Sequence, residues 1–267
     1  MVATDLDGTV VCHDGSMSAR TLQALAAVEE AGLVLVLVTG RPPRWMAPVV
    51  EATGHRGVAI CANGGIVYDL HSEQVLEQFA IDPAVAHAVV QRLRAAMPTA
   101  GFAIERAEGF HHESTYAHPW PDPDMRSVET IERVLDAPIA KLLVRDPSST
   151  SDAMLELATE LLGDQVTVTH SNPRDCLLEI SAAGVTKAST LARVAAELGI
   201  APHEVVAFGD QPNDVAMLHW AGRGYAMGNA HPDVRAAMTL HAASVEDDGV
   251  ARVLEQLLGD GIIPRWT

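Results

Sequence analysis

The chain is poor in basic residues and has no long apolar run. Its 267 residues include 18 lysines and arginines against 35 aspartates and glutamates, a formal net charge of −17. Nucleic acids and anionic membranes bind basic patches, and no lysine- or arginine-rich stretch is present here. No apolar run approaches the ~18 residues that a membrane-spanning helix needs, and no signal-peptide pattern opens the sequence. We therefore expect neither a nucleic-acid partner nor a membrane partner.

Cysteine is also scarce. The three cysteines, Cys12, Cys61 and Cys176, are odd in number and widely spaced. This pattern argues against a disulfide framework and fits a reducing cytosol. None of the three has the spacing of a zinc ligand pair. We therefore expect a cytoplasmic protein without disulfides.

The most informative segment that is present is Asp5-Leu6-Asp7-Gly8-Thr9, which follows the short apolar start Met1-Val2-Ala3. We expect a short first strand, with the carboxylates at its carboxyl end, where open α/β sheets bind ligands. Side chains two apart on a strand share a face, so both carboxylates are predicted to point the same way. Crowded carboxylates and a hydroxyl suit a hard cation such as Mg2+, and one carboxylate can attack phosphorus to form an aspartyl-phosphate.

Three later segments strengthen this interpretation. The apolar run 34–38, typical of a buried parallel strand, ends in Thr39-Gly40-Arg41. The segment 184–187 opens a helical stretch with Lys187. A further apolar strand, 205–208, ends in Gly209-Asp210-Gln211-Pro212-Asn213-Asp214. The carboxylate pair, the Thr-Gly turn and the second acidic loop thus follow strands, whereas the lysine begins a helix.

In this order, the four segments resemble the haloacid dehalogenase superfamily of aspartate-nucleophile phosphohydrolases, in its Cof-type branch. The resemblance covers nearly the whole chain and extends to the segments 63–65, 178–180, 226–230 and 248–251. It implies an α/β fold, with a Rossmann-like parallel-sheet core and an inserted α+β cap domain. Thr4 stands where members of the family usually have a bulky residue. This difference bears on the stability of the first strand more than on the chemistry.

The chain is predicted to divide into a discontinuous core, residues 1–81 and 183–267, and a cap, residues 82–182. In the core, Ser18 is expected to cap a helix to about Ala31, Pro42 and Pro43 to open the next helix, and 63–65 to form a turn. In the cap, we expect a polar loop over 109–124 and a helix over 128–135. That loop, with His112 and Tyr116, is a candidate selector of the leaving group.

The resemblance also implies roles for individual residues. Asp5 would be the nucleophile and Asp7 the acid and base, because crowded carboxylates can have different pKa values. The cofactor Mg2+ would bind the Asp5 side chain, the Asp7 backbone carbonyl and Asp210. Asp214 would position the metal or the lysine. The phosphate would be bound by the four remaining residues, Thr39, Gly40, Lys187 and Asn213.

Each motif alone has a plainer interpretation. Thr39-Gly40 could be an ordinary turn, Lys187 a solvated lysine, and Asp210 with Asp214 a helix cap. His111 and His112 are adjacent rather than i, i+4, so a zinc site with His118 is disfavoured.

The preferred function is a Mg2+-dependent phosphatase acting on a small phosphorylated metabolite, such as a sugar phosphate. A phosphomutase of the same superfamily is the alternative. A non-catalytic phospho-signalling module is disfavoured, since Asp7 supplies a base that a stable aspartyl-phosphate does not need. Neither the particular substrate nor the oligomeric state follows from the sequence.

Overall fold

The structure is a computed structural model that describes residues 1–107, 109–117, 125–172 and 175–260. The chain forms two compact units. One combines Met1–Glu77 with Lys187–Thr267, and the other is the intervening Gln78–Thr186. Within the described residues, no helix is long and apolar enough to cross a membrane.

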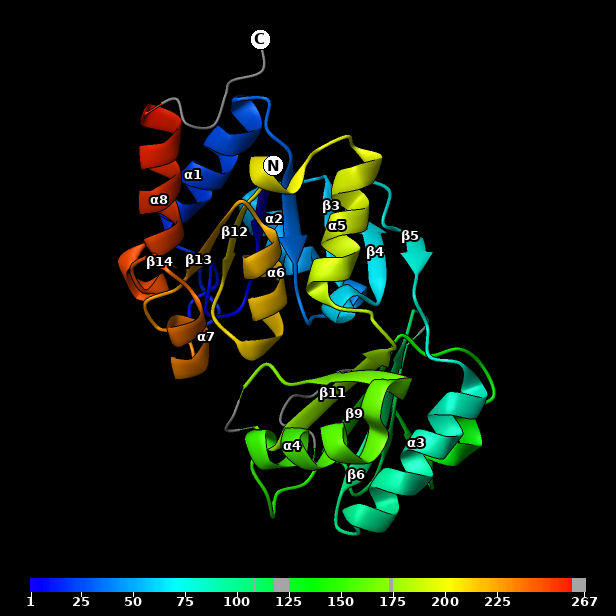
Figure 1. Ribbon diagram of the computed structural model, residues 1–267. Coiled ribbons are helices and arrows are strands. Elements are labelled where there is room, and N and C mark those ends of the chain that lie inside the picture. Colours follow the sequence, from blue (N-terminus) through cyan, green and yellow to red (C-terminus); the bar gives the residue numbers. More distant parts are fainter. Residues whose placement is uncertain (108, 118–124, 173–174, 261–267) are drawn as a thin grey trace. The chain divides into compact units, whose positions relative to one another are not determined.

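The first unit is built on an eight-stranded sheet in the order β14-β13-β12-β1-β2-β3-β4-β5 (Figure 1). The pairs from β14 through to β3 are parallel, and β4 runs antiparallel to β3. The central strands are buried and almost wholly apolar, as parallel strands covered on both faces must be. The strands are β1 (Val2–Thr4), β2 (Leu35–Val38), β3 (Val58–Cys61), β4 (Ile66–Asp69), β5 (Gln74–Gln78), β12 (Val206–Gly209), β13 (Arg223–Ala226) and β14 (Leu240–His241).

Helices cover this sheet, with α1 packed on α8 and α5 packed on α6 (Figure 1). The Ser18 hydroxyl accepts a hydrogen bond from the Thr21 amide at 3.0 Å, which confirms the predicted cap of α1. The predicted helix start at Pro42 and Pro43 is wrong, because these residues open a 3-10 turn before α2 begins at Ala47. The helices are α1 (Ala19–Glu30), α2 (Ala47–Thr53), α5 (Lys187–Glu197), α6 (Val215–Trp220), α7 (Pro232–Ala237) and α8 (Gly249–Gly259).

The strand order reverses at β1. From β1 the chain continues to β2 and β3 on one side, and it later adds β12, β13 and β14 on the other. The chain therefore leaves the carboxyl ends of β1 and β12 in opposite directions, and open α/β sheets bind ligands at such a point. The segments beginning at Asp5 and Asp210 lie at this point.

The second unit contains a six-stranded sheet in the order β10-β11-β9-β6-β7-β8. All its pairs are antiparallel except β7 with β8. Helices α3 (Pro83–Ala96) and α4 (Ser151–Leu162) share one apolar core with the strands. The strands are β6 (Gly101–Arg106), β7 (Gly109–Glu113), β8 (Met125–Val128), β9 (Lys141–Arg145), β10 (Val166–Thr169) and β11 (Leu177–Ala182).

Two predictions for this unit are wrong. The expected loop over 109–124 begins instead with strand β7, which pairs with β6, while residues 118–124 lie outside the described residues. The expected helix over 128–135 is replaced by the end of β8 and a 3-10 turn, Ile131–Val134. Pairing of β8 with β7, and a hydrogen bond from the Ile131 amide to the Glu113 carboxylate at 2.8 Å, override the local helix preference.

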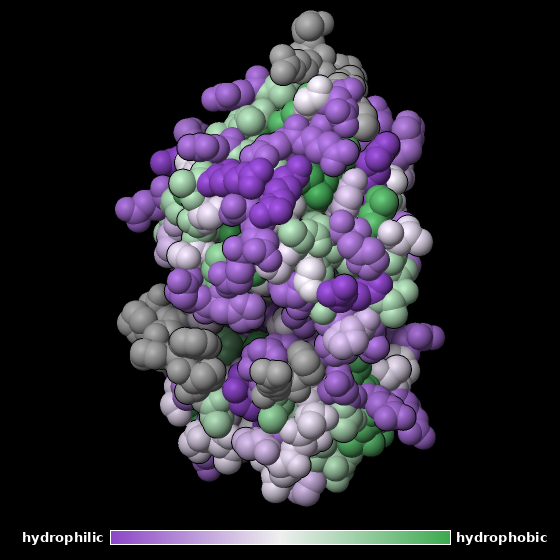
Figure 2. Space-filling model, turned by 90° about the vertical axis from the view of Figure 1, so that its left-hand side faces the viewer, coloured by the Kyte–Doolittle hydropathy of each residue, from purple (hydrophilic) through white to green (hydrophobic). Residues whose placement is uncertain are grey.

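Polar residues dominate one face of the molecule (Figure 2), although 48% of the chain is hydrophobic. On the face shown in Figure 2, hydrophilic residues predominate and apolar residues occur in small scattered patches. Exposed apolar residues in such an arrangement are normal and point to no particular partner.

Candidate active site

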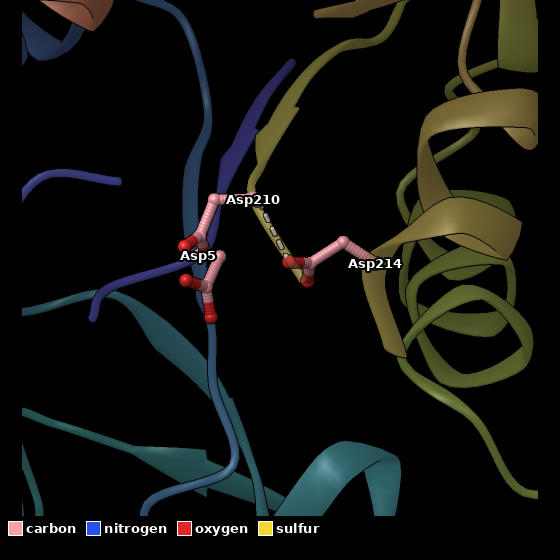
Figure 3. Close-up of side chains that lie close together, drawn as sticks. All are labelled: Asp5, Asp210 and Asp214. Carbon is pink, nitrogen blue, oxygen red and sulfur yellow. Dashed lines mark hydrogen bonds between the residues drawn. The ribbon is translucent and has the colours of Figure 1, made fainter. Parts of the chain in front are cut away.

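Three carboxylates meet at the carboxyl ends of β1 and β12. Asp5 directly follows β1, and its amide donates to the Phe208 carbonyl of β12 at 3.0 Å. Asp210 directly follows β12, and Asp214 lies four residues further on. One oxygen from each carboxylate lies within 4.8 Å of the other two, and all three residues are buried. Figure 3 shows the side chains of Asp5, Asp210 and Asp214 gathered between these strand ends and the turn that precedes α6.

A buried lysine joins two of these carboxylates. Lys187 is the first residue of α5, and its Nζ donates to Asp5 Oδ1 and to Asp214 Oδ1, both at 2.6 Å. Burial alone would lower the pKa of Lys187, but the charges of Asp214 and Asp5 outweigh it and raise that pKa. Lys187 is therefore a charged member of the cluster and not a solvated surface lysine.

The backbone holds Asp214 in place. Its Oδ2 accepts hydrogen bonds from the amides of Asp210 and Gln211, each at 3.0 Å, and the first of these is the dashed line in Figure 3. A Cβ atom on Gly209 would lie 2.5 Å from the Asp214 Cβ, so only glycine permits this approach. Asp214 therefore caps the turn and binds the lysine at the same time.

The cluster carries more negative than positive charge. Burial, reinforced by Asp214 and Asp7 and opposed by Lys187, raises the pKa of Asp5 to about 7. Burial, with the charges of Asp5 and Asp214, raises the pKa of Asp210 to about 8. A hard cation would relieve this repulsion, and all the donor atoms are oxygens, the ligands that Mg2+ prefers. The residues present therefore fit a magnesium site.

Asp7 lies apart from the cluster, and the prediction that it shares a strand face with Asp5 is wrong. Strand β1 ends at Thr4, and Asp7 sits in a turn that forms an isolated bridge with Val11. Its side chain is 59% exposed and pairs with Arg41 through two contacts, Nε to Oδ2 at 2.9 Å and Nη2 to Oδ1 at 2.5 Å. The turn that follows the strand, which sequence periodicity does not reveal, sets this direction.

The predicted phosphate-binding residues lie at the ends of neighbouring elements. Thr39 follows β2, and its Oγ1 accepts from the Arg41 amide at 3.0 Å, with Gly40 between them. Asn213 lies in the 3-10 turn Pro212–Asp214, and its Nδ2 donates to Asn63 Oδ1 at 3.1 Å. The sequence predicted residue 63 only as part of a turn, which is correct but incomplete.

Among the residues that the structure describes, the histidines of β7 belong to no cluster of three possible metal ligands. Among the described residues, the acidic cluster is the one group of three or more possible ligands close enough to hold a metal. His112 Nδ1 contacts the Glu113 carbonyl at 3.0 Å, and its ring stacks on Phe110. Tyr116, which was expected to help select the leaving group, is 5% exposed and packs on Phe110 in a small apolar core. His118 lies outside the described residues.

Comparison with known proteins identifies the family. The sequence model of the haloacid dehalogenase-like hydrolases matches residues 2–254. A pyridoxal phosphate phosphatase of Escherichia coli is 27% identical over 95% of this chain and 97% of its own. A Bacillus subtilis phosphatase of 5-amino-6-(5-phospho-D-ribitylamino)uracil is also 27% identical, over 95% of this chain and 94% of its own.

A solved structure shows the same fold. A haloacid dehalogenase-like hydrolase from B. subtilis superposes with a TM-score of 0.83 at 22% identity, covering 96% of this chain and 99% of the other. The expected α/β fold is confirmed by this likeness, and the expected phosphoric monoester hydrolase by the curated relatives. The chain belongs to the haloacid dehalogenase-like hydrolases and is a phosphatase of that family.

Proposed function

We propose that this phosphatase depends on Mg2+ and hydrolyses a small phosphorylated metabolite through an aspartyl-phosphate on Asp5. The observation that carries the proposal is the buried Asp5 carboxylate, bound by Lys187 and surrounded by Asp210 and Asp214. A phosphate monoester is very slow to hydrolyse in water, so the site must align a nucleophile and neutralise charge.

The contacts of Asp5 orient it as the nucleophile. Lys187 binds Oδ1 at 2.6 Å, and the Thr9 hydroxyl donates to Oδ2 at 3.2 Å. Because both oxygens are held, the carboxylate needs little reorganisation before it attacks. Attack forms a bond from an Asp5 oxygen to phosphorus and breaks the ester P–O bond, whose electron pair leaves with the alcohol oxygen.

Asp7 supplies the proton in the first step and removes one in the second. As an acid it protonates the departing alcohol oxygen, and as a base it then takes a proton from the water that attacks phosphorus and releases Asp5. In the structure Arg41 binds the Asp7 carboxylate, so this contact would have to open before Asp7 acts on the leaving group.

The metal and the phosphate would use different groups. Mg2+ would bind the carboxylates of Asp5 and Asp210 and the Asp7 backbone carbonyl. Asp214 would hold the metal or Lys187 in position. When bound, the metal supplies positive charge that offsets the repulsion between carboxylate and phosphate. The phosphate oxygens would bind the four remaining residues, namely the Thr39 hydroxyl, the Gly40 amide, the Lys187 ammonium and the Asn213 amide.

The substrate is proposed to be a sugar phosphate or a similar phosphomonoester. The two relatives cited above are named for pyridoxal phosphate and for a phosphorylated ribitylaminouracil, both small phosphorylated compounds. We propose that residues 82–182 act as a cap that selects the leaving group. We also propose a cytoplasmic location, on the basis of three scattered cysteines, none of them in a disulfide.

A screen of phosphorylated metabolites tests the proposal. Free phosphate should appear for at least one small phosphomonoester, in the presence of Mg2+ and not after chelation. A phosphomutase would instead retain the phosphoryl group on its product and require a bisphosphate activator. A chain that becomes phosphorylated without releasing phosphate would favour the signalling alternative.

A further inference from the structure

The loop at the end of β3 has an unusual backbone. Ala62, Asn63 and Gly64 all have positive φ angles, of 51°, 58° and 103°. Few residues other than glycine adopt this conformation, and asparagine tolerates it better than most. Such strain persists where the surrounding structure enforces it, often beside a functional site.

Hydrogen bonds tie this loop to the segment after β2. The Ala62 amide donates to the Arg41 carbonyl at 2.9 Å, and the Asn63 amide donates to the Thr39 carbonyl at 3.0 Å. On the other side, the Thr190 hydroxyl of α5 donates to the Gly64 carbonyl at 2.8 Å. The strained loop is therefore fixed between the proposed phosphate-binding segment and the helix that begins with Lys187.

The side chain of Asn63 faces Asn213. Asn63 is only 2% exposed, and its Oδ1 accepts a hydrogen bond from Asn213 Nδ2 at 3.1 Å. Within the described part of the chain, Asn63 Nδ2 and Asn213 Oδ1 are buried atoms without a hydrogen-bond partner. Exchanging N and O in both amides would leave the same deficit. Buried polar atoms nearly always have a hydrogen-bond partner, so the hydrogen bonding of these two carboxamides is incomplete.

We infer that Asn63 is a positioning residue that orients the Asn213 amide toward the substrate phosphate. This inference rests on the phosphate-binding role proposed for Asn213. An unrestrained carboxamide can present either its oxygen or its nitrogen, and an oxygen would repel a phosphate. The Asn63 oxygen holds the nitrogen of Asn213, which leaves the second N–H of that nitrogen to bind a phosphate oxygen.

The left-handed backbone of Asn63 allows its side chain to be removed without disturbing the loop. Asn63→Gly removes the side-chain oxygen, whereas glycine adopts positive φ without strain, so the loop is retained. Glu73→Gly is a matched control, because Glu73 also has a positive φ, of 55°, but is exposed in the turn before β5. An unchanged melting temperature in both variants establishes that the fold is intact.

Inorganic phosphate, used as a competitive inhibitor, measures binding at the phosphate site separately from the phosphoryl-transfer reaction. We expect Asn63→Gly to raise the inhibition constant of phosphate and KM about tenfold, as for a lost hydrogen bond to a charged group, with a smaller change in kcat. Glu73→Gly should match wild type. In an Asn213→Ala background, Asn63→Gly should have no further effect, since the residue acts through Asn213.

Two results would overturn the inference alone: an unchanged phosphate inhibition constant in Asn63→Gly, or a full additional loss in the double variant. If wild type releases no phosphate from any monoester, the proposed function itself fails, and this inference fails with it.

Discussion

Mg2+ should stabilise this protein, and more strongly at pH 8 than at pH 6. The reason lies in the buried carboxylates of Asp5 and Asp210, whose pKa values rise from an ordinary value of 3.8 to about 7 and about 8. Between roughly pH 4 and pH 8 the folded chain therefore binds more protons than the unfolded chain. Without metal, raising the pH through this window lowers the free energy of unfolding.

A bound cation reverses this effect, because it stabilises the ionised carboxylates of the folded state. A ligand that binds only the native state adds ~2.7 kcal/mol when present at 100 times its Kd. For a unit of this size, each kcal/mol raises Tm by roughly 2–4 °C, so an increase of about 5–10 °C is expected. At pH 6 protons compete for the same oxygens, and the increase should be smaller.

Scanning calorimetry in EDTA and in MgCl2, at pH 6 and pH 8, measures this directly. Asp210→Asn should lose most of the Mg2+-dependent shift, since it removes one carboxylate of the cluster. Asp233→Asn is a suitable control, because the Asp233 side chain is 88% exposed and lies outside the cluster. A shift that is absent at pH 8, larger at pH 6, or unchanged in Asp210→Asn would refute the reasoning.

Three further predictions follow from individual contacts. Asp7→Asn should slow the phosphorylation step for alkyl phosphates by about 10²–10⁴-fold and for aryl phosphates much less; equal losses in single-turnover assays of that step would remove Asp7 as the acid. Lys187→Met should lower the free energy of unfolding, measured in urea, by about 3–5 kcal/mol, because it leaves two buried carboxylates without their cation. A decrease below ~1 kcal/mol would contradict the buried ion-pair network. Gly8→Ala should weaken Mg2+ binding at least about tenfold, or ~1.4 kcal/mol, since a Cβ there would lie 2.4 Å from Asp210 Oδ2. If calorimetric titration finds wild-type affinity, the close contact between Gly8 and Asp210 does not matter for metal binding.

The sequence predicted the parts of the site that follow apolar strands. Asp5, Thr39 and Asp210 each come directly after a buried parallel strand. Because the carboxyl ends of parallel strands share one edge of a sheet, the proximity of these residues could be expected from the order of strands and motifs alone. The burial of Lys187 could not be read from composition, since most lysines are solvated.

What the sequence missed depends on turns and on tertiary contacts. The direction of Asp7 is set by the turn after Thr4 and by Arg41, which lies 34 residues away in the chain. The contact of Asn63 with Asn213 spans 150 residues and needs a left-handed backbone that a turn motif does not specify. Strand β8 likewise forms because β7 provides an edge for it.

The most direct test of the account is to identify the phosphorylated residue. In a rapid-quench experiment with an aryl phosphate and Mg2+, mass spectrometry should find phosphate on the peptide that contains Asp5. The adduct should accumulate in Asp7→Asn, which can be phosphorylated but lacks the base for hydrolysis, and should be absent in Asp5→Asn. A phosphorylated residue other than Asp5, or phosphate release by Asp5→Asn within about tenfold of wild type, ~1.4 kcal/mol in barrier, would contradict the account.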